Sequence, residues 1–345
     1  MQVKSLAQPT IRLFPPLWSW QNVLSILLSL AGSIFPASAF AAQTNASTDP
    51  IDKDVRYVNC SSSNTLINGI NAALASLDPS EDNTIYVNGA CRENVNITGF
   101  DRLQLIAQNG ASITDASGDT AAVISIDNST RVSVHGFTIN GNGPNAQNEV
   151  IDCTFSYCAF SGNTIQGGSD GVDVFRAARA AFHGDVIQNN NNGAGIFVGQ
   201  DGFVLAIGLT TQGNGQGANV AGGFLQINTS TVQNNLGAGI VVRLNGTVNM
   251  FTSSVTGNGG NGINVFGHST LQLGSGGGTI GSSITNNSGA GVVVRDLSFA
   301  NFPDGVSNIV KSNLGGADVI CSPQFPATRG ALTNIGGGST NCVEP

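Results

Sequence analysis

The stretch QNNNNGAGIFV occupies residues 188–198, and close copies of it recur later in the chain. These copies are QNNLGAGIVV at residues 233–242, TGNGGNGINV at 256–265 and TNNSGAGVVV at 285–294. Each places asparagine before a glycine and ends in apolar residues. A phrase that returns every few tens of residues is typical of repeat architectures, in which each repeat is one structural unit.

The glycine that opens each Gly-x-x-Val segment sets the period. Successive glycines lie 24, 22, 22, 23 and 29 residues apart, and they are Gly171, Gly195, Gly217, Gly239, Gly262 and Gly291. The first and third residues after the glycine are apolar in all six copies, whereas the second varies. Because side chains of a strand alternate between two faces, the constant positions are predicted to point inward and the variable ones outward.

A period near 22 residues is too short for a strand–helix–strand unit, which needs about 30 residues. Three short strands and three turns fit one coil of an all-β solenoid, with successive coils about 4.8 Å apart. Residues 84–315 are then predicted to form about ten coils. This pattern resembles the right-handed parallel β-helix family, which includes pectate lyases, polygalacturonases and many exported proteins that act on carbohydrates.

Both ends of such a solenoid need covering, because an end coil exposes strand edges and core. Residues 64–83 are predicted to contain a short capping helix, whose apolar residues Leu66, Ile70, Ala73 and Leu77 share one face. The period is lost in residues 316–345, which we expect to form a C-terminal cap pinned by a disulfide.

The first 41 residues have the features of a secretory signal. Lys4 and Arg12 precede an apolar run over residues 23–35, and small residues follow at PASAFAA. An uncleaved membrane anchor is the alternative, but the run is short for a membrane helix. We expect a polar linker at residues 42–63, a mature chain without a membrane span, and a secreted, periplasmic or cell-envelope location.

The formal net charge is −8, and only 10% of residues are charged. Nucleic-acid binding depends on clustered lysines and arginines that neutralise phosphates, so this composition argues against it.

Six cysteines follow the expected signal: Cys60, Cys91, Cys153, Cys158, Cys321 and Cys342. An even number in an exported chain predicts disulfides, with 15 possible pairings. Proximity favours 60–91, 153–158 and 321–342. A zinc site is the alternative, although the chain has no paired C-x-x-C spacing.

The asparagines before the phrase glycine are predicted to stack from coil to coil. Asn191, Asn235, Asn258 and Asn287 lie four residues before it, and Asn214 lies three before. An amide both donates and accepts hydrogen bonds, so stacked asparagines can satisfy one another. We favour this structural role over the alternative of a row that binds sugar or metal.

One segment, residues 169–185, concentrates charge in this charge-poor chain. It contains Asp170, Asp173, Arg176, His183 and Asp185, which we take as the candidate catalytic set. Such carboxylates could perform acid–base chemistry on a glycosidic bond, or hold calcium against an acidic sugar. A solvated face with local Asp–Arg pairs is the alternative interpretation.

Part of this segment, Ser169-Asp170-Gly171-Val172-Asp173, resembles the Asn-Thr-Asp-Gly-x-Asp motif of polygalacturonases. The resemblance implies that Asp170 matches a catalytic aspartate. The other family motifs are missing: there is no later Asp-Asp pair, and Gly267-His268 lacks the second glycine.

Three phenylalanines are predicted to project outward from one sheet: Phe175, Phe197 and Phe266. Their rings could stack on sugars, or they could pack beneath the C-terminal segment. We add the isolated Arg243 to this candidate binding set.

The hypothesis that we favour is a non-catalytic exported protein whose surface binds a polysaccharide, a cell-surface glycan or another partner. The alternative is a lyase or glycoside hydrolase that acts on an acidic polysaccharide. We expect no cofactor or metal, with calcium possible only if the protein is a lyase. The sequence makes no prediction of the oligomeric state.

Overall fold

The computed structural model describes residues 53–61, 69–143, 145–191, 193–274, 280–322, 328–329 and 335–342. The expected signal sequence lies outside these residues. Within them, no helix is both long and apolar enough to cross a membrane.

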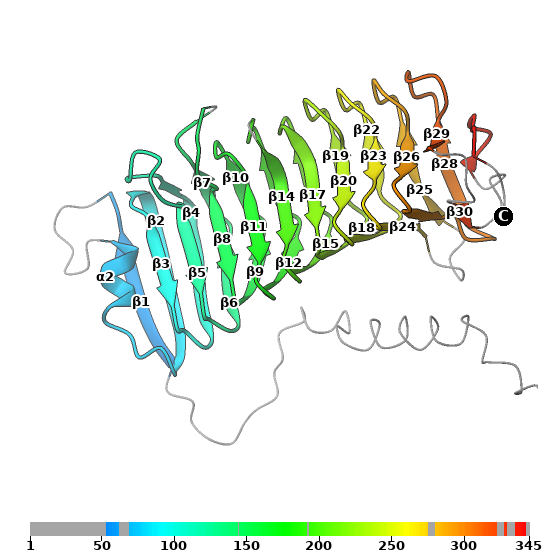
Figure 1. Ribbon diagram of the computed structural model, residues 1–345. Coiled ribbons are helices and arrows are strands. Elements are labelled where there is room, and N and C mark those ends of the chain that lie inside the picture. Colours follow the sequence, from blue (N-terminus) through cyan, green and yellow to red (C-terminus); the bar gives the residue numbers. More distant parts are fainter. Residues whose placement is uncertain are drawn as a thin grey trace, which may run out of the picture. The chain divides into compact units, whose positions relative to one another are not determined.

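The chain winds into a parallel β-solenoid whose coils contribute strands to three stacks (Figure 1). The first stack is a ten-stranded sheet, which confirms the prediction of about ten coils. Its strands are β3 (Val95–Thr98), β5 (Ile124–Asp127), β8 (Ile151–Thr154), β11 (Val172–Phe175), β14 (Ala194–Gly199), β17 (Gln216–Ala221), β20 (Ile240–Arg243), β23 (Ile263–Val265), β26 (Val292–Arg295) and β29 (Val319–Ser322).

The second and third stacks are joined into one sheet because the long strands β2 and β4 take part in both. The second stack contains β1 (Lys53–Asn59), β2 (Asp82–Arg92), β4 (Leu103–Thr114), β6 (Val132–His135), β9 (Tyr157–Ser161), β12 (Arg179–His183), β15 (Phe203–Ile207), β18 (Phe224–Asn228), β21 (Thr247–Phe251), β24 (Thr270–Leu273), β27 (Phe299–Asn301) and β30 (Thr328–Arg329). The third contains β7 (Thr138–Asn140), β10 (Thr164–Gln166), β13 (Val186–Gln188), β16 (Thr210–Gln212), β19 (Thr231–Gln233), β22 (Ser254–Thr256), β25 (Ile280–Thr285) and β28 (Ser307–Lys311).

The repeated phrase forms the strands of the first stack. Its twelve constant apolar residues are all buried, none more than 3% exposed, as the alternation predicts. They also align from coil to coil: Val172 pairs with Ile196, and Ile196 pairs with Ala218. The variable residue between them faces outward.

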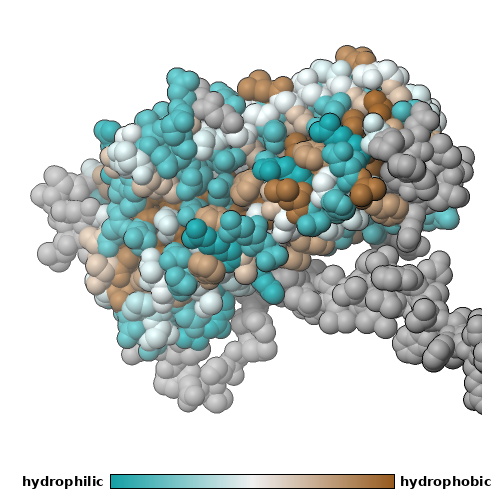
Figure 2. Space-filling model, in the orientation of Figure 1, coloured by the Kyte–Doolittle hydropathy of each residue, from teal (hydrophilic) through white to brown (hydrophobic). Residues whose placement is uncertain are grey.

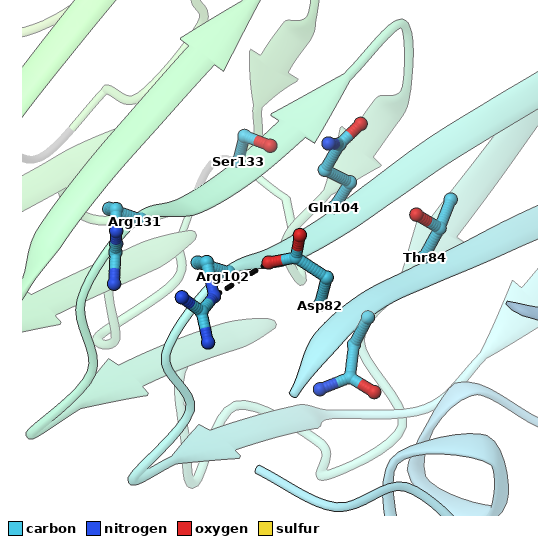
Figure 3. A pocket seen from close by; sticks show the side chains of 7 residues that line it. Asp82, Thr84, Arg102, Gln104, Arg131 and Ser133 are labelled. Atoms are coloured by element: carbon cyan, nitrogen blue, oxygen red, sulfur yellow. Dashed lines mark ion pairs between the residues drawn. The ribbon is translucent and has the colours of Figure 1, made fainter. Parts of the chain in front are cut away.

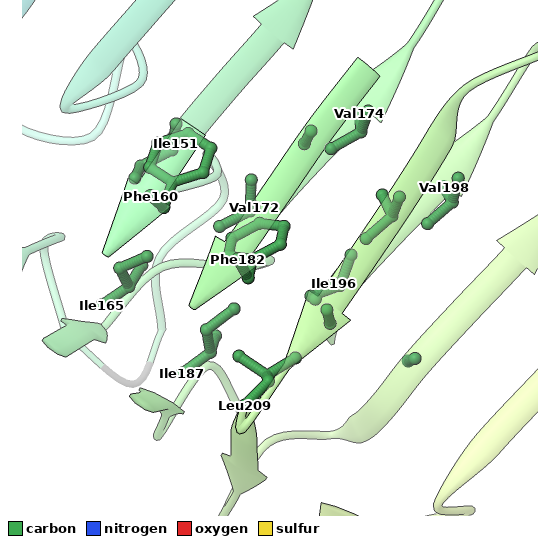
Figure 4. Close-up of a cluster of buried hydrophobic side chains, with 14 of the residues drawn as sticks. Ile151, Phe160, Ile165, Val172, Val174, Phe182, Ile187, Ile196, Val198 and Leu209 are labelled. Atoms are coloured by element: carbon green, nitrogen blue, oxygen red, sulfur yellow. The ribbon is translucent and has the colours of Figure 1, made fainter. Parts of the chain in front are cut away.

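Identical residue types stack inside the solenoid as well. Phe160 and Phe182 are fully buried on neighbouring strands, with ring centroids 5.0 Å apart (Figure 4). Ile165 and Ile187 repeat this contact in the third stack. Burial of each such side chain is worth about 1.5–3 kcal/mol, so the core stabilises every coil by a similar amount.

Buried asparagine amides form the predicted ladder along the turn between the third and first stacks. Each Nδ2 donates to the Oδ1 of the next asparagine at 2.8–3.1 Å, through Asn190, Asn214, Asn235, Asn258, Asn287 and Asn313. The same Oδ1 also accepts the backbone N–H of the previous member, and Asp318 ends the series. These asparagines therefore have the structural role that was predicted for the repeated phrase.

One predicted ladder member was wrong. Asn190 occupies the position, and Asn191 lies outside the ladder, half-buried. The ladder residue always comes two positions after the last residue of the third-stack strand, as Asn190 follows Gln188. The distance from the ladder residue to the phrase glycine varies, so counting back from Gly195 misplaces it.

These neighbours provide a matched pair of substitutions. Asn190→Ala would leave the buried Gly168 N–H without its acceptor and would remove one of the two donors to the Asn214 oxygen, so we expect it to lower the free energy of unfolding by about 2–4 kcal/mol. Asn191→Ala is expected to change it by less than about 0.5 kcal/mol. Urea denaturation of both variants measures this, and equal effects would contradict the assignment.

The N-terminal end departs from prediction. Residues 42–63 were expected to be a linker, but Lys53–Asn59 form strand β1, which pairs in register with β2 along its whole length. The sequence did not predict this strand because the segment is rich in charged residues and its apolar alternation is short. Tyr57 stacks on Tyr86 with centroids 5.3 Å apart, and the solenoid therefore begins before residue 84.

The expected capping helix at 64–83 is the five-residue helix α2 (Ile70–Leu74). Ile70, Ala73 and Leu77 are buried as predicted, whereas Leu66 lies outside the described residues. The Glu93 carboxylate accepts the N–H groups of Ile70 and Asn71, which fixes the start of the helix against the first coils.

The C-terminal cap was expected to begin at residue 316, but it begins later. Val319–Ser322 are strand β29, in register with Val292–Arg295, so the solenoid continues past residue 315. The described cysteines form three disulfides, Cys60–Cys91, Cys153–Cys158 and Cys321–Cys342, which are the pairs favoured by proximity. Cys321–Cys342 ties the last strand of the first stack to the tail.

Apolar side chains on the face shown in Figure 2 lie in separate patches between polar ones. Several exposed large apolar residues of the described chain stand singly in turns, such as Leu244 and Leu297 between the first and second stacks. Single exposed apolar residues are common on soluble surfaces and mark no interface by themselves.

Candidate functional site

Two carboxyl groups lie side by side on the outer face of the first stack. Asp152 on β8 and Asp173 on β11 are register partners, and Phe197 on β14 is the next residue in the same outward row. Adjacent strands are about 4.8 Å apart, so the two carboxyl groups and the ring share one surface. The Asp152–Asp173 pair, with Glu149 and Asp170 beside it, is called the acidic cluster below.

Asp173 has the most unusual environment of the cluster. Its Oδ1 is buried and has no hydrogen-bond partner among the described residues. Burial, followed by the negative charges of Asp170, Glu149 and Asp152, raises its pKa to about 9. Asp173 therefore carries a proton at neutral pH and can donate a hydrogen bond.

Asp152 is held in a more polar environment. The Thr154 hydroxyl donates to its Oδ1 at 2.7 Å. Burial raises the pKa of Asp152, and the charges of Glu149 and Asp127 add to this, whereas the Thr154 bond and Arg176 lower it. The two neighbouring carboxyl groups thus differ in their preference for the proton.

Asp170 holds the next coil in place. Its Oδ1 accepts the backbone N–H of Ala194. Burial raises the pKa of Asp170, and that hydrogen bond opposes the rise. One oxygen of the residue that resembles the polygalacturonase aspartate is therefore committed to a turn, although the residue does adjoin Asp173.

Arg176 brings a positive charge to the same face. Its guanidinium carbon lies 5.0 Å from the ring centroid of Phe175 and 6.0 Å from that of Phe155, which is 54% exposed. Contacts of this kind are worth about 0.5–1 kcal/mol at exposed sites. They hold the cation beside the acidic cluster.

The five candidate catalytic residues do not converge. Asp170, Asp173 and Arg176 lie on or beside β11, but His183 is exposed at the end of β12, in the second stack. Asp185 is fully buried in the following turn. Sequence proximity grouped them wrongly because the chain turns from one sheet to another between residues 175 and 179.

Asp185 has a structural role instead. Its carboxylate accepts the N–H and Nδ2 of Asn163 and the N–H of His183, at 2.8–2.9 Å. Burial raises the pKa of Asp185 to about 6, although these hydrogen bonds act to lower it. Asn163 occupies the same turn position one coil earlier, so Asp185 continues a turn-stabilising column.

This buried acid predicts a pH-dependent stability. Because the folded-state pKa of about 6 exceeds the ordinary 3.8, its contribution is full below pH 3.8 and is lost as the pH rises through 6. The loss amounts to about 3 kcal/mol. We expect the stability of wild type relative to Asp185→Asn to fall by this order between pH 3.5 and 7.5. Parallel urea-denaturation profiles of the two proteins would contradict this.

The four candidate binding residues all belong to the first stack or its edge. Phe175 and Phe197 are half-buried on its outer face, and Phe266 directly follows β23. The Arg295 guanidinium lies 4.8 Å from the Phe266 ring centroid, and Arg243 Nε donates to Asn219 Oδ1 at 3.1 Å. Phe175 and Phe197 adjoin the acidic cluster, whereas Phe266 and Arg243 lie further along the stack.

Sequence reasoning missed Asp152, Glu149 and Phe155. They precede Gly171, where the measurable repeat begins. The available signal was the alternation Ile151-Asp152-Cys153, which matches Val172-Asp173-Val174 and places both aspartates outward.

The cluster offers no compact set of metal ligands. Among the described residues, the potential ligand atoms that lie within 4.8 Å of one another as a trio belong to Cys60, Cys91 and Glu93, and these cysteines form a disulfide. The carboxylates on the outer face are therefore too dispersed to surround calcium as they stand.

Residues 122–276 match the family model described as "Right handed beta helix region". This match agrees with the parallel three-stack fold and singles out no member of the family. None of the curated proteins compared with the chain matches it.

Several solved structures are similar to this chain. The A-module of the Azotobacter vinelandii mannuronan C-5 epimerase AlgE4 has a TM-score of 0.53 and 10% identity, over 76% of this chain and 91% of that one. Pectate lyase Pel9A has a TM-score of 0.42 and 15% identity, over 79% and 76% of the two chains. At such identities the likeness concerns the fold alone.

Proposed function

We propose that the outer face of the first stack binds an uncharged, hydroxyl-rich polysaccharide, and that the protein is a carbohydrate-binding protein rather than an enzyme. The observation that carries the proposal is Asp173. The Oδ1 of its protonated carboxyl group is unpartnered, yet the residue lies on an outward row beside Phe197. A sugar hydroxyl can both accept from it and donate to it, which removes the cost of an unpaired buried group.

The neighbouring aromatic residues support a sugar ligand. Phe175, Phe197 and the exposed Phe155 provide apolar surface next to hydrogen-bonding groups, a combination that suits a ring with both apolar and hydroxyl-bearing sides. The stack continues along the coils, so an extended chain can follow it.

The charges favour a neutral chain over a polyuronate. The site is surrounded by four acids, Glu149, Asp152, Asp170 and Asp173. Among the groups that shift the pKa of Asp152, Arg176 is the cation. A polyanion would face repulsion from the ionised members. The acidic polysaccharide of the enzyme hypothesis is therefore disfavoured.

Three disulfides are consistent with an oxidising compartment, so we place the protein outside the cytoplasm, secreted or in the cell envelope.

The proposal predicts a pH profile of binding. Affinity for the glucan, mannan or xylan that binds best should be constant from pH 6 to 8 and fall above about pH 9, as Asp173 loses its proton. Asp173→Asn keeps a donor that does not titrate, so its binding should not fall there. Affinity electrophoresis or calorimetry measures both, and equal loss in the variant would contradict the assignment.

Phe197→Ala should weaken the same binding about tenfold or more, because the ring supplies apolar contact area. Phe224→Ala is its control: Phe224 is also half-buried on an outer face, but it stacks on Phe203 in the second stack, with centroids 4.9 Å apart. Equal weakening by both substitutions, or tighter binding of pectate and alginate than of neutral chains, would exclude the proposal.

A second candidate function is glycoside hydrolysis, favoured by the unequal Asp152–Asp173 pair. Residues on neighbouring strands are about 4.8 Å apart, near the roughly 5–5.5 Å between the carboxyl groups of retaining hydrolases. Asp173 would protonate the leaving oxygen and Asp152 would attack the sugar. New reducing ends from a neutral polysaccharide, abolished by Asp152→Asn, would establish this activity and overturn the non-catalytic proposal.

A further inference from the structure

The ring of Phe197 lies over the glycine two residues further along β14. Ile196 and Val198 point into the core (Figure 4), so Phe197 and Gly199 share the outer face of the first stack. A Cβ atom added at Gly199 would lie 2.8 Å from Phe197 Cε1 and 3.0 Å from Phe197 Cζ. Because Cζ is the ring atom farthest from the backbone of Phe197, the ring extends along the strand and does not stand away from the sheet. The ring therefore fills the space of the side chain that residue 199 lacks.

The backbone does not require glycine at position 199. The φ angle of Gly199 lies outside the left-handed region, so a residue with a side chain could adopt its conformation. Its partner on β17 is Ala221, and Ala221 pairs with Arg243 on β20, so the same outward position carries side chains in later coils. Outside Phe197, the added Cβ would meet only Ala221 O, at an ordinary 3.5 Å. Glycine inside a strand often marks the close approach of another group, which here is the Phe197 ring.

Hydrogen-bonding side chains flank this ring along the solenoid axis. Asp173 on β11 and Asn219 on β17 are the register partners of Phe197, one coil to either side. Asp173 carries a proton and an unpartnered oxygen, and Asn219 presents an amide whose oxygen accepts from Arg243. The ring remains partly exposed, so it forms the centre of a surface that has polar groups at both edges.

This arrangement discriminates between sugars by stereochemistry. Equatorial hydroxyl groups project from the rim of a pyranose ring, whereas axial hydroxyl groups project from its faces. A sugar stacked on Phe197 can direct rim hydroxyls to Asp173 and Asn219. An axial hydroxyl on the stacked face would separate the two rings and lose apolar contact. An axial hydroxyl turned to solvent would leave the sugar with one rim hydroxyl fewer.

We propose that Gly199 is a positioning residue of the polysaccharide site. Because it lets the Phe197 ring lie along the sheet, it favours chains of β-linked glucose or xylose, whose hydroxyls are all equatorial. Chains of β-linked mannose, which has an axial hydroxyl on every unit, bind less well. The inference rests on the proposed binding of a neutral polysaccharide and narrows its ligand.

The polar hollow on the second stack is a different kind of surface (Figure 3). Thr84, Gln104 and Ser133 cross it as register partners on β2, β4 and β6. The Asp82–Arg102 ion pair, at 2.6 Å, lies beside this row. None of the residues that line the hollow is aromatic, so it has no ring on which a sugar can stack. The backbone amides of these three strands therefore provide an internal control in binding experiments.

Cellohexaose, xylohexaose and mannohexaose test the preference, because cellohexaose and mannohexaose differ only in the configuration of one hydroxyl group per unit. In NMR titrations of the full protein, cellohexaose and xylohexaose should shift the amides of β11, β14 and β17, and not those of β2, β4 and β6. Their affinity should exceed that of mannohexaose by about fivefold or more. Equal binding of mannohexaose would overturn the inference and leave the proposed function intact. If no neutral saccharide shifts the amides of the first stack, both fail.

Gly199→Ala tests the positioning role, because its methyl group would displace the ring. We expect this variant to bind cellohexaose about fivefold more weakly, with a smaller change for mannohexaose, so that the preference falls. In a Phe197→Ala background there is no ring to displace, and the same substitution should leave binding unchanged. An equal loss in both backgrounds would indicate a general effect on the strand and overturn the positioning role. Binding of cellohexaose by Gly199→Ala as tightly as by wild type would also overturn it.

The position of the ring can be checked without a ligand. Protons against the face of an aromatic ring resonate upfield, so the Gly199 Hα signals should move downfield in Phe197→Ala. Gly199→Ala should raise the thermal midpoint in the Phe197→Ala background, since alanine restricts the unfolded chain more than glycine does. In wild type the ring opposes the added methyl group, and no such rise is expected. Unchanged Hα signals, or the same thermal shift in both backgrounds, would overturn the inference.

Discussion

In-register parallel stacking is the constraint on which the rest of this structure depends. Each coil hydrogen-bonds to the next along its strands, so a residue at a given position meets its counterpart one coil away. An inward position must then suit the same interior in every coil. The result is the invariant apolar positions of the phrase and the amide ladder, in which each asparagine satisfies its neighbour.

The same constraint leaves only outward positions free to differ. In the row that contains Asp152, the later strands carry Asn219, Val241 and Asn264. Nothing in the backbone requires two acids and a phenylalanine to meet at β8, β11 and β14. Because burial of Asp152 and Asp173 opposes the ionisation of their carboxyl groups, the two acids weaken the fold locally. Such a cost is expected of groups that serve binding or chemistry and not stability.

The sequence was sufficient for the architecture because one interior environment repeats about ten times, and the pattern could be counted. It failed where a single position had to be placed. Asn191 was chosen over Asn190 because turn length varies between the ladder and the glycine. Asp185 and His183 were grouped with Asp173 because neighbours in sequence occupy different sheets once the chain bends.

Stability in a stacked array is approximately a sum over units and their interfaces, so one unfavourable coil can be supported by its neighbours. The ladder that begins at Asn190 runs through the later coils, whereas Asp173 lies before it. The regular later coils thus help to stabilise the less regular earlier coils through the interfaces between them. This division explains how a long, regular solenoid can retain carboxyl groups whose burial opposes ionisation on its earlier coils without losing the fold.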